Sequence, residues 1–284
     1  MPTAGANTWG SRVSPCRGSR GMMMDRRIGR LMVLAGVSLL IAADRPAGYL
    51  GGATVDITGV VPPPPMKGDI RYATDRDVFK AMKRQVGSPR WKAATSDVNY
   101  STPVMEADFS CATGLALTPD RFPALTRLLD NASADTGRAN NYAKNRWQRL
   151  RPFRIDPGET CEDKKELGDS YDYPSGHTTK GWTLGLVLAD VLPDRANPIL
   201  ARARAYGESR IVCRVHNFSA VENGRLGATV TMATVRQTPG YLADLAAARA
   251  EVAAARAAAP AAAGPSCGAE DALLGPSVLQ GLKK

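Results

Sequence analysis

The sequence has few of the residues that mark several specialised classes of protein. Aromatic residues make up only 6% of its 284 residues, and the chain contains just two histidines. Lysine and arginine form no run interleaved with aromatics, so the net charge of +10 does not indicate a nucleic-acid partner. No two cysteines have the C-x2-C spacing of a zinc site, and we expect no metal. The positive charge instead favours small anionic ligands.

Long apolar runs are also missing. Residues 31–43 form an apolar run of 13 residues after the basic pair Arg26-Arg27, whereas a membrane-spanning helix needs about 20. A basic stretch, a short apolar stretch and small residues are typical of a secretory signal peptide. We therefore interpret residues 1–43 as an N-terminal extension and signal peptide, with a permanent N-terminal anchor as the alternative. The prediction is a periplasmic or secreted protein with no stable membrane span after cleavage.

Four cysteines remain after the predicted cleavage: Cys111, Cys161, Cys213 and Cys267. An even number in an exported chain predicts disulfide bonds. Three pairings are open, and the sequence does not choose among them. Four free buried thiols are the alternative.

The remaining chain reads as one helical domain with two less regular ends. Residues 44–69 are an extended, Pro-rich lead-in that includes Pro62–Pro65. Residues 70–258 contain helical periodicity without hairpin signals or repeats, which predicts a single-domain, all-α helical bundle. Residues 259–284 form an Ala/Pro/Gly-rich C-terminal tail, tied down only if Cys267 is bridged.

Individual helices follow from periodicity and capping signals. Thr74 and Ser219 each begin a capping-box pattern, the second ending in Glu222. The segment 178–192 is apolar nearly all round, which predicts a buried central helix. We expect helices over 75–86, from Thr118, from about 133 to Arg151, and over 178–192, 198–212, 219–235 and 241–259.

Cations recur near the end of the expected polar helix. Lys144 and Arg151 are seven residues apart, which is two helical turns, so we expect both to point the same way. Two stacked cations repel each other, and an anion between them would remove that repulsion. A solvated basic face is the alternative, because Arg146 and Arg149 are nearby.

Both histidines lie in short polar segments. Ser175, Gly176 and His177 precede the central helix, where free backbone N–H groups and the helix dipole favour an anion. Arg210 lies near the end of the next helix, and His216 follows in the turn. Taken separately, the first segment is also a common turn at helix starts, and an arginine near a helix C-terminus is a common surface residue.

In order and spacing these segments resemble the signature of the type 2 phosphatidic acid phosphatase superfamily, K-x6-RP, PSGH and SR-x5-H-x3-D, and most closely the class A bacterial non-specific acid phosphatases. The resemblance implies an all-α fold, no cofactor, and broad-specificity hydrolysis of phosphate monoesters to inorganic phosphate. It further implies a phosphohistidine intermediate, with His216 as nucleophile and His177 as acid. The residues implied to hold the phosphoryl oxygens are Lys144, Arg151, Ser175, Gly176 and Arg210.

One position departs from the family pattern. Ala220 stands where the family has an aspartate that orients the nucleophilic imidazole. Glu222 is the candidate orienting acid if its side chain reaches back to His216, although its capping-box role is the simpler interpretation. A backbone carbonyl or the Asn217 amide would also serve.

Two other functions stay open. Loss of the family aspartate would also fit a catalytically impaired, phosphate-binding pseudoenzyme. A vanadate-dependent haloperoxidase is a further alternative, because vanadate mimics the same oxyanion. The sequence leaves open whether the chain forms a homo-oligomer.

Overall fold

The structure, a computed structural model, describes residues 46–258, 267–280 and 282. The predicted signal peptide lies outside the described residues. Within these ranges the regular elements are all helical and no strand is present, which confirms the predicted fold class. The α-helices are α1 (Ile70–Ala81), α2 (Pro89–Ser96), α3 (Thr102–Asp108), α4 (Ser110–Thr113), α5 (Pro123–Trp147), α6 (Lys164–Leu167), α7 (Gly176–Val191), α8 (Ala196–Val212), α9 (Phe218–Val235), α10 (Pro239–Ala258) and α11 (Cys267–Leu274). Short 3-10 helices are η1 (Ile57–Gly59), η2 (Met82–Gln85), η3 (Pro152–Arg154) and η4 (Pro193–Arg195).

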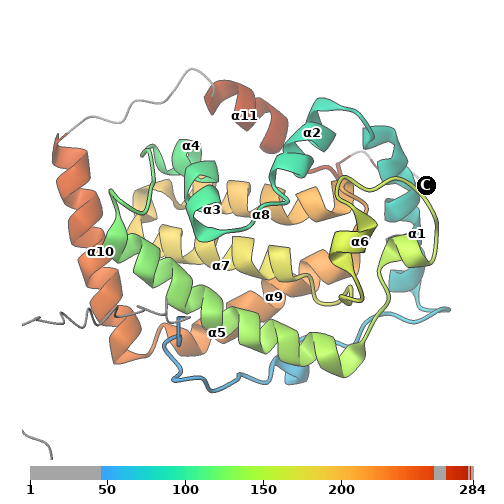
Figure 1. The fold of residues 1–284 in the computed structure, drawn as a ribbon, viewed down its shortest axis with the longest axis horizontal. Helices are drawn as coiled ribbons and strands as arrows, with labels where there is room; N and C mark the ends of the chain where they lie inside the picture. Colours follow the sequence, from blue (N-terminus) through green and yellow to red (C-terminus); the bar gives the residue numbers. More distant parts are fainter. Residues whose placement is uncertain (1–45, 259–266, 281, 283–284) are drawn as a thin grey trace, which may run out of the picture. The chain divides into compact units, whose positions relative to one another are not determined.

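Helix α7 is the central element of the fold (Figure 1). It packs against α5, α8 and α9, and α10 crosses one end of α5 and α7. Its sequence is apolar on nearly every side, so burial on all sides is favourable. Leu184, Val187 and Leu188 are fully buried, and Ser175 caps the N-terminus with its side-chain oxygen. The predicted buried helix over 178–192 is confirmed.

Two glycines of α7 allow α8 to approach closely. A Cβ atom at Gly181 would lie 2.6 Å from Tyr206 Cδ1, and one at Gly185 would lie 2.5 Å from Ala203 Cβ. Both distances are below van der Waals contact, so a side chain at either position would push the helices apart. This antiparallel packing places the N-terminus of α7 beside the C-terminal part of α8, where Arg210 lies.

Helix α5 covers a region where the sequence predicts two helices. The helix expected from Thr118 and the polar helix after it form one continuous helix of 25 residues, Pro123–Trp147. It ends at Gln148, whose φ is +47° and whose N–H bonds to the carbonyl of Lys144. Arg151 therefore lies beyond the helix. The prediction that Lys144 and Arg151 share one helix face is wrong, because the helix ends before Arg151.

Both predicted capping boxes are also wrong. Helix α1 begins at Ile70 with Asp69 as its N-cap, so Thr74 lies inside the helix. Helix α9 begins after Asn217, and Ser219 does not cap it. The backbone N–H and the hydroxyl of Ser219 bond instead to the carboxylate of Asp75, at 2.7 and 2.6 Å. The backbone N–H and hydroxyl of Ser219 therefore bond to a buried carboxylate of α1, and not to groups in the first turn of α9 as the capping box predicts.

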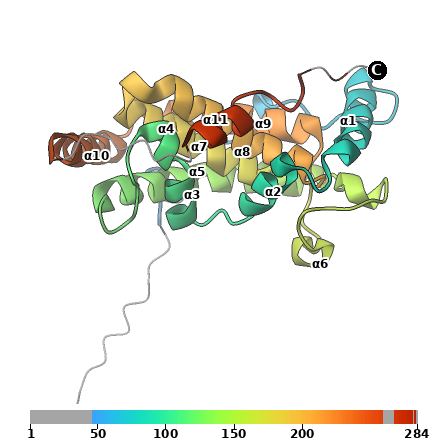
Figure 2. The same ribbon diagram turned by 90° about the horizontal axis from the view of Figure 1, so that it is seen from above.

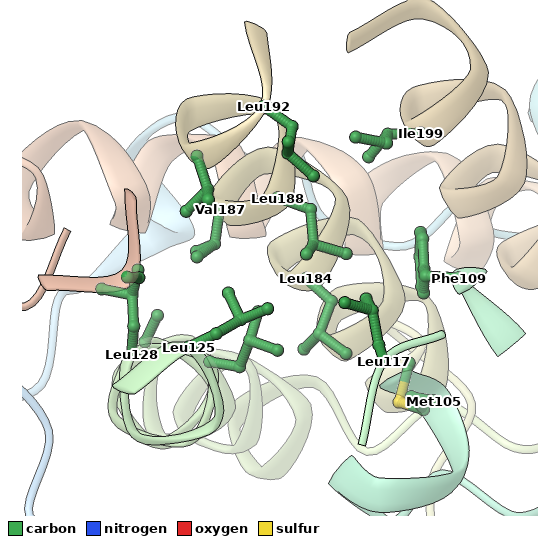
Figure 3. Close-up of a cluster of buried hydrophobic side chains, with 14 of the residues drawn as sticks. Met105, Phe109, Leu117, Leu125, Leu128, Leu184, Val187, Leu188, Leu192 and Ile199 are labelled. Carbon is green, nitrogen blue, oxygen red and sulfur yellow. The ribbon is translucent and has the colours of Figure 1, made fainter. Parts of the chain in front are cut away.

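The main apolar cluster lies between α5, α7 and α8, with α3 at its edge (Figure 3). Burial of one leucine or phenylalanine side chain stabilises a fold by about 1.5–3 kcal/mol, so this cluster fixes α5 against α7. No helix among the described residues is long and apolar enough to cross a membrane. The labelled members of the cluster are Met105, Phe109, Leu117, Leu125, Leu128, Leu184, Val187, Leu188, Leu192 and Ile199.

Two disulfide bonds select one of the three open pairings. Cys111 bonds to Cys267 with a Cα–Cα distance of 5.3 Å, and Cys161 bonds to Cys213 at 4.8 Å. The first bond joins α4 to α11, which also packs against α2 and α8. The second joins the loop before α7 to the C-terminal end of α8. This loop, which includes α6, extends away from the helical layers (Figure 2).

Candidate active site

A cavity of about 680 Å³ lies at the N-terminus of α7, a volume within the range of small-molecule sites. Residues from all three sequence motifs line it: Lys144, Arg151, Gly176, His177 and His216. They come from the end of α5, the segment after it, the start of α7 and the turn between α8 and α9. The fold therefore brings together residues that are far apart in the sequence.

Both ring nitrogens of His216 have partners. Nδ1 lies 3.0 Å from Oδ1 of Asp172, and Nε2 lies 3.0 Å from Nη1 of Arg151. An ionised carboxylate only accepts hydrogen bonds, and a guanidinium only donates them. The neutral ring therefore has its proton on Nδ1 and its lone pair on Nε2. Because Arg151 also lines the cavity, the unprotonated nitrogen is the one on the side of the cations.

Asp172 is fully buried and has several donors besides His216. The backbone N–H and side-chain amide of Asn217 donate to its two oxygens at 3.1 and 2.8 Å, and Nη1 of Arg149 lies 3.4 Å from Oδ2. Burial raises the pKa of Asp172, while Arg149 and the bonds from Asn217 act in the opposite direction. These contacts orient the carboxylate that in turn orients His216.

The carboxylate reaches His216 from 44 residues earlier in the chain, whereas the family position is four residues later. Ala220 itself lies in a buried apolar cluster with Ile57, Val61 and Tyr173, and its carbonyl accepts a bond from the Ser175 N–H at 3.0 Å. Position 220 therefore contributes packing and a backbone acceptor, and the carboxylate next to His216 comes from Asp172.

Glu222 is not placed to orient His216. Its carboxylate pairs with Arg225 one turn later in α9, and its side chain is 44% exposed. The prediction of Glu222 as the orienting acid is wrong, because Asp172 occupies Nδ1 of the ring.

A tight turn after α8 places His216 close to Arg210. Arg214 has a φ of +59°, and the N–H groups of Val215 and His216 both point to the carbonyl of Arg210, at 3.2 and 3.3 Å. Left-handed backbone costs a non-glycine residue roughly 1–2 kcal/mol. The guanidinium of Arg214 lies over the ring of Phe79, 4.4 Å from its centroid, a contact that offsets part of that cost.

His177 has a different environment at the start of α7. Its Nε2 lies 2.9 Å from the carbonyl oxygen of Val98, so Nε2 is the donor and the lone pair of the neutral ring is on Nδ1. The ring packs against Tyr100 with centroids 4.1 Å apart. Burial lowers the pKa of His177 well below its usual value, and the nearby Arg210 lowers it further.

The cations around the cavity repel one another. Burial, with a contribution from Arg151, lowers the pKa of Lys144 to about 8, and burial lowers the pKa of Arg151 to about 10. A Cβ atom at Gly176 would lie 4.0 Å from Nζ of Lys144, so the glycine leaves room for a ligand beside the ammonium. An anion here would stabilise both charged forms.

Arg210 and Ser175 lie behind the cavity wall and are fully buried. Nη2 of Arg210 pairs with Glu162, whereas its Nε and Nη1 are buried and have no hydrogen-bond partner within the described ranges. The hydroxyl oxygen of Ser175 accepts bonds from the N–H and hydroxyl of Thr178 at 3.4 and 2.9 Å. Its own hydroxyl hydrogen remains for another acceptor.

Comparison with known proteins identifies the family. Residues 128–243, which contain all three motifs, match the PAP2 superfamily. The acid phosphatase of Zymomonas mobilis subsp. mobilis is 36% identical over 192 residues, which cover 67% of this chain and 73% of that protein. The chain belongs to the PAP2 superfamily. Within it, the non-specific acid phosphatases of Salmonella typhimurium (34% over 195 residues, 68% of this chain and 78% of that protein) and Providencia stuartii (32% over 202 residues, 70% and 82%) are also similar to the chain.

Two residues at the site of this PAP2 superfamily member, Asp172 and Glu162, were not predicted from the sequence. Both lie in the aperiodic segment between the first two motifs, where local pattern gives no burial signal. The only signal in the sequence was proximity, since Asp172 lies two residues before Pro174, the first residue of the PSGH motif. Among the described residues, no three His, Cys, Asp or Glu side chains are grouped as metal ligands would be.

Proposed function

We propose that the protein is an acid phosphatase that hydrolyses small phosphate monoesters through a phosphohistidine on Nε2 of His216. The supporting observation is the pair of contacts that sets the tautomer of this ring: Asp172 at Nδ1 and Arg151 at Nε2. An imidazole with its free lone pair beside buried cations suits attack on an anionic phosphoryl group. The similar proteins of Zymomonas mobilis and Salmonella typhimurium are acid phosphatases, which supports the same substrate class.

In the first step, the phosphoryl oxygens are bound by Lys144, Arg151 and the N–H of Gly176, with Arg151 shifting from Nε2 to an oxygen. Nε2 of His216 then forms a bond to phosphorus as the bond to the ester oxygen breaks. His177 donates a proton from Nδ1 to the departing alcohol. The ring of His216 becomes cationic, and Asp172 stabilises that charge.

In the second step, water attacks phosphorus and the phosphorus–nitrogen bond breaks. His177, now neutral, accepts a proton from the water, so both histidines return to their starting states. The net reaction is ester plus water to alcohol plus inorganic phosphate. Ser175 and Arg210 would also hold phosphoryl oxygens from behind the cavity wall, once Arg210 has separated from Glu162.

The protonation states required here give an acidic to near-neutral optimum. Without ligand, burial keeps the pKa of both histidines low, so both rings are neutral. A bound phosphoryl anion favours the charged form of His177, and substrate therefore binds together with a proton. At high pH that proton is scarce and the rate falls; at low pH His216 becomes protonated and the rate falls again.

We also propose that the enzyme is exported from the cytoplasm. Two disulfide bonds support an oxidising compartment, in line with export to the periplasm or outside the cell. We include metal independence and broad specificity in the proposal, and we expect no nucleic-acid partner. A binding-only pseudoenzyme would be expected if no group oriented His216. The contact between Asp172 and His216 supports the catalytic proposal instead.

Hydrolysis of p-nitrophenyl phosphate by the full chain in EDTA, beside His216→Ala, tests the proposal. We expect EDTA-resistant turnover that the substitution lowers by about 10⁴-fold or more, since the nucleophile is lost. Turnover that EDTA abolishes, or that His216→Ala retains, would contradict it. A parent protein that binds phosphate without turnover would be the binding-only form. Halide oxidation with vanadate would point to the haloperoxidase.

A further inference from the structure

A carboxylate of the protein already contacts one of the cations that we propose to bind the phosphoryl group. Glu162 pairs through Oε1 with Nη2 of Arg210, and its side chain is 7% exposed. Glu162 also lines the cavity that Lys144 and His216 line. A residue that lines the cavity therefore pairs with a guanidinium that is fully buried.

The other donors of Arg210 are unused. Nε and Nη1 are buried and find no hydrogen-bond partner within the part of the chain that the structure describes. A buried guanidinium with a single carboxylate contact has unmet hydrogen-bonding capacity, and unmet capacity is costly for a buried charged group. A tetrahedral oxyanion would satisfy these donors better than one carboxylate oxygen does.

The position of Glu162 is set by a covalent link. Cys161, directly before it, bonds to Cys213, three residues after Arg210. The Cys161 N–H also lies 3.4 Å from the Cys213 carbonyl, and the hydroxyl of Thr160 donates to the Glu162 carbonyl at 2.8 Å. These contacts hold the loop carrying Glu162 against the end of α8.

Glu162 and a bound phosphoryl group would compete for Arg210. The carboxylate already pairs with this guanidinium, and the phosphoryl oxygens would use donors of the same guanidinium. Sharing Arg210 would hold the two anions in contact in a buried site. Like charges in contact are strongly unfavourable there, so the carboxylate must leave Arg210 as the phosphoryl group arrives.

We infer that Glu162 is an internal competitor for the phosphoryl site, and that it sets the affinity of the site for phosphate. Glu162 neutralises Arg210 until a phosphoryl group binds. Substrate displaces it, and its return to Arg210 helps to expel inorganic phosphate after the second step. The disulfide keeps the displaced carboxylate close enough to return. The inference rests on the proposed phosphatase function for its role in turnover, but the competition itself does not need turnover.

Calorimetric titration with inorganic phosphate at pH 6 and low salt measures this competition in the full chain. We expect Glu162→Gln to bind phosphate about tenfold more tightly or better, because the neutral amide competes less well for Arg210. Glu159→Gln is the matched control: it removes the same charge from an exposed residue of the same loop, and we expect a change of less than about twofold. Thermal melting of each variant shows that it is folded.

Equal or weaker phosphate binding by folded Glu162→Gln would overturn the inference, because it would make Glu162 a support for Arg210. Equal gains for Glu162→Gln and Glu159→Gln would also overturn it, since net charge alone would then explain them. If Glu162→Gln does not fold, Glu162→Asp replaces it: the shorter side chain pairs less well with Arg210, and a smaller gain in affinity is expected. No gain there contradicts the inference. A gain in affinity without turnover in the parent would support the competition while removing the phosphatase proposal.

Discussion

The two histidines of the cavity occupy contrasting surroundings. His216 lies in a turn between two helices and has a carboxylate at one nitrogen and a guanidinium at the other. His177 lies in the first turn of α7, bonded through one nitrogen to a backbone carbonyl and packed against Tyr100. A carboxylate partner can stabilise a ring that becomes positively charged, whereas a carbonyl mainly fixes its orientation. This difference supports the proposed mechanism, in which His216 makes the covalent attack and His177 transfers the proton.

Substitution of His177 gives the largest effect that separates the two roles. With His177→Ala we expect a loss of about 10²–10⁴-fold in kcat for a simple alkyl phosphate, since its alkoxide leaves only when protonated. For p-nitrophenyl phosphate, whose phenolate leaves readily, the loss should be much smaller. Steady-state kinetics with both substrates measures the ratio, and His216→Ala should abolish both reactions alike. An equal loss for the two esters with His177→Ala would contradict its role as the acid.

Lys144 allows a smaller and more specific test on the cation side of His216. Its pKa of about 8 means that the ammonium loses its charge just above neutrality. Because the charged form binds the anion, phosphate affinity should fall as pH rises from 8 to 9, by up to about tenfold per pH unit. Lys144→Arg keeps the charge, so its affinity relative to the parent should rise over that interval. Titration of both proteins with phosphate at each pH cancels the ionisation of phosphate itself. Parallel curves for the two proteins would show that Lys144 is not the group that titrates.

The parts of the structure that sequence predicted are those that local pattern determines. Helical periodicity predicted the all-α fold and the buried helix over 178–192, because an apolar face requires a packing partner. The three motifs predicted five residues that line the cavity, Lys144, Arg151, Gly176, His177 and His216, whereas Ser175 and Arg210 lie behind its wall. Lys144 and Arg151 both line the cavity, but they do not share a helix face as expected. The end of α5 depends on the left-handed backbone of Gln148, which no periodicity encodes.

The features that the sequence did not predict depend on polar contacts between residues far apart in the chain. The donors of Ser219 belong to Asp75, which lies 144 residues away, and the carboxylate at His216 lies 44 residues before it. No local spacing rule reaches such distances. Glu222 fitted a local rule and therefore seemed the nearer acid, yet its side chain bonds to Arg225 on the outer part of α9. A missing family residue is thus better sought in the whole fold than among its sequence neighbours.

The measurement that tests the central claim most directly is kcat for p-nitrophenyl phosphate in Asp172→Asn beside Glu222→Gln. Both substitutions remove one carboxylate charge near α9 while keeping similar size. We predict that Asp172→Asn lowers kcat by about 10²–10⁴-fold, because the amide no longer stabilises the charged ring or fixes its tautomer. Glu222→Gln should stay within about twofold of the parent. A large loss in Glu222→Gln with near-normal turnover in folded Asp172→Asn would contradict the assignment of Asp172 as the residue that orients His216.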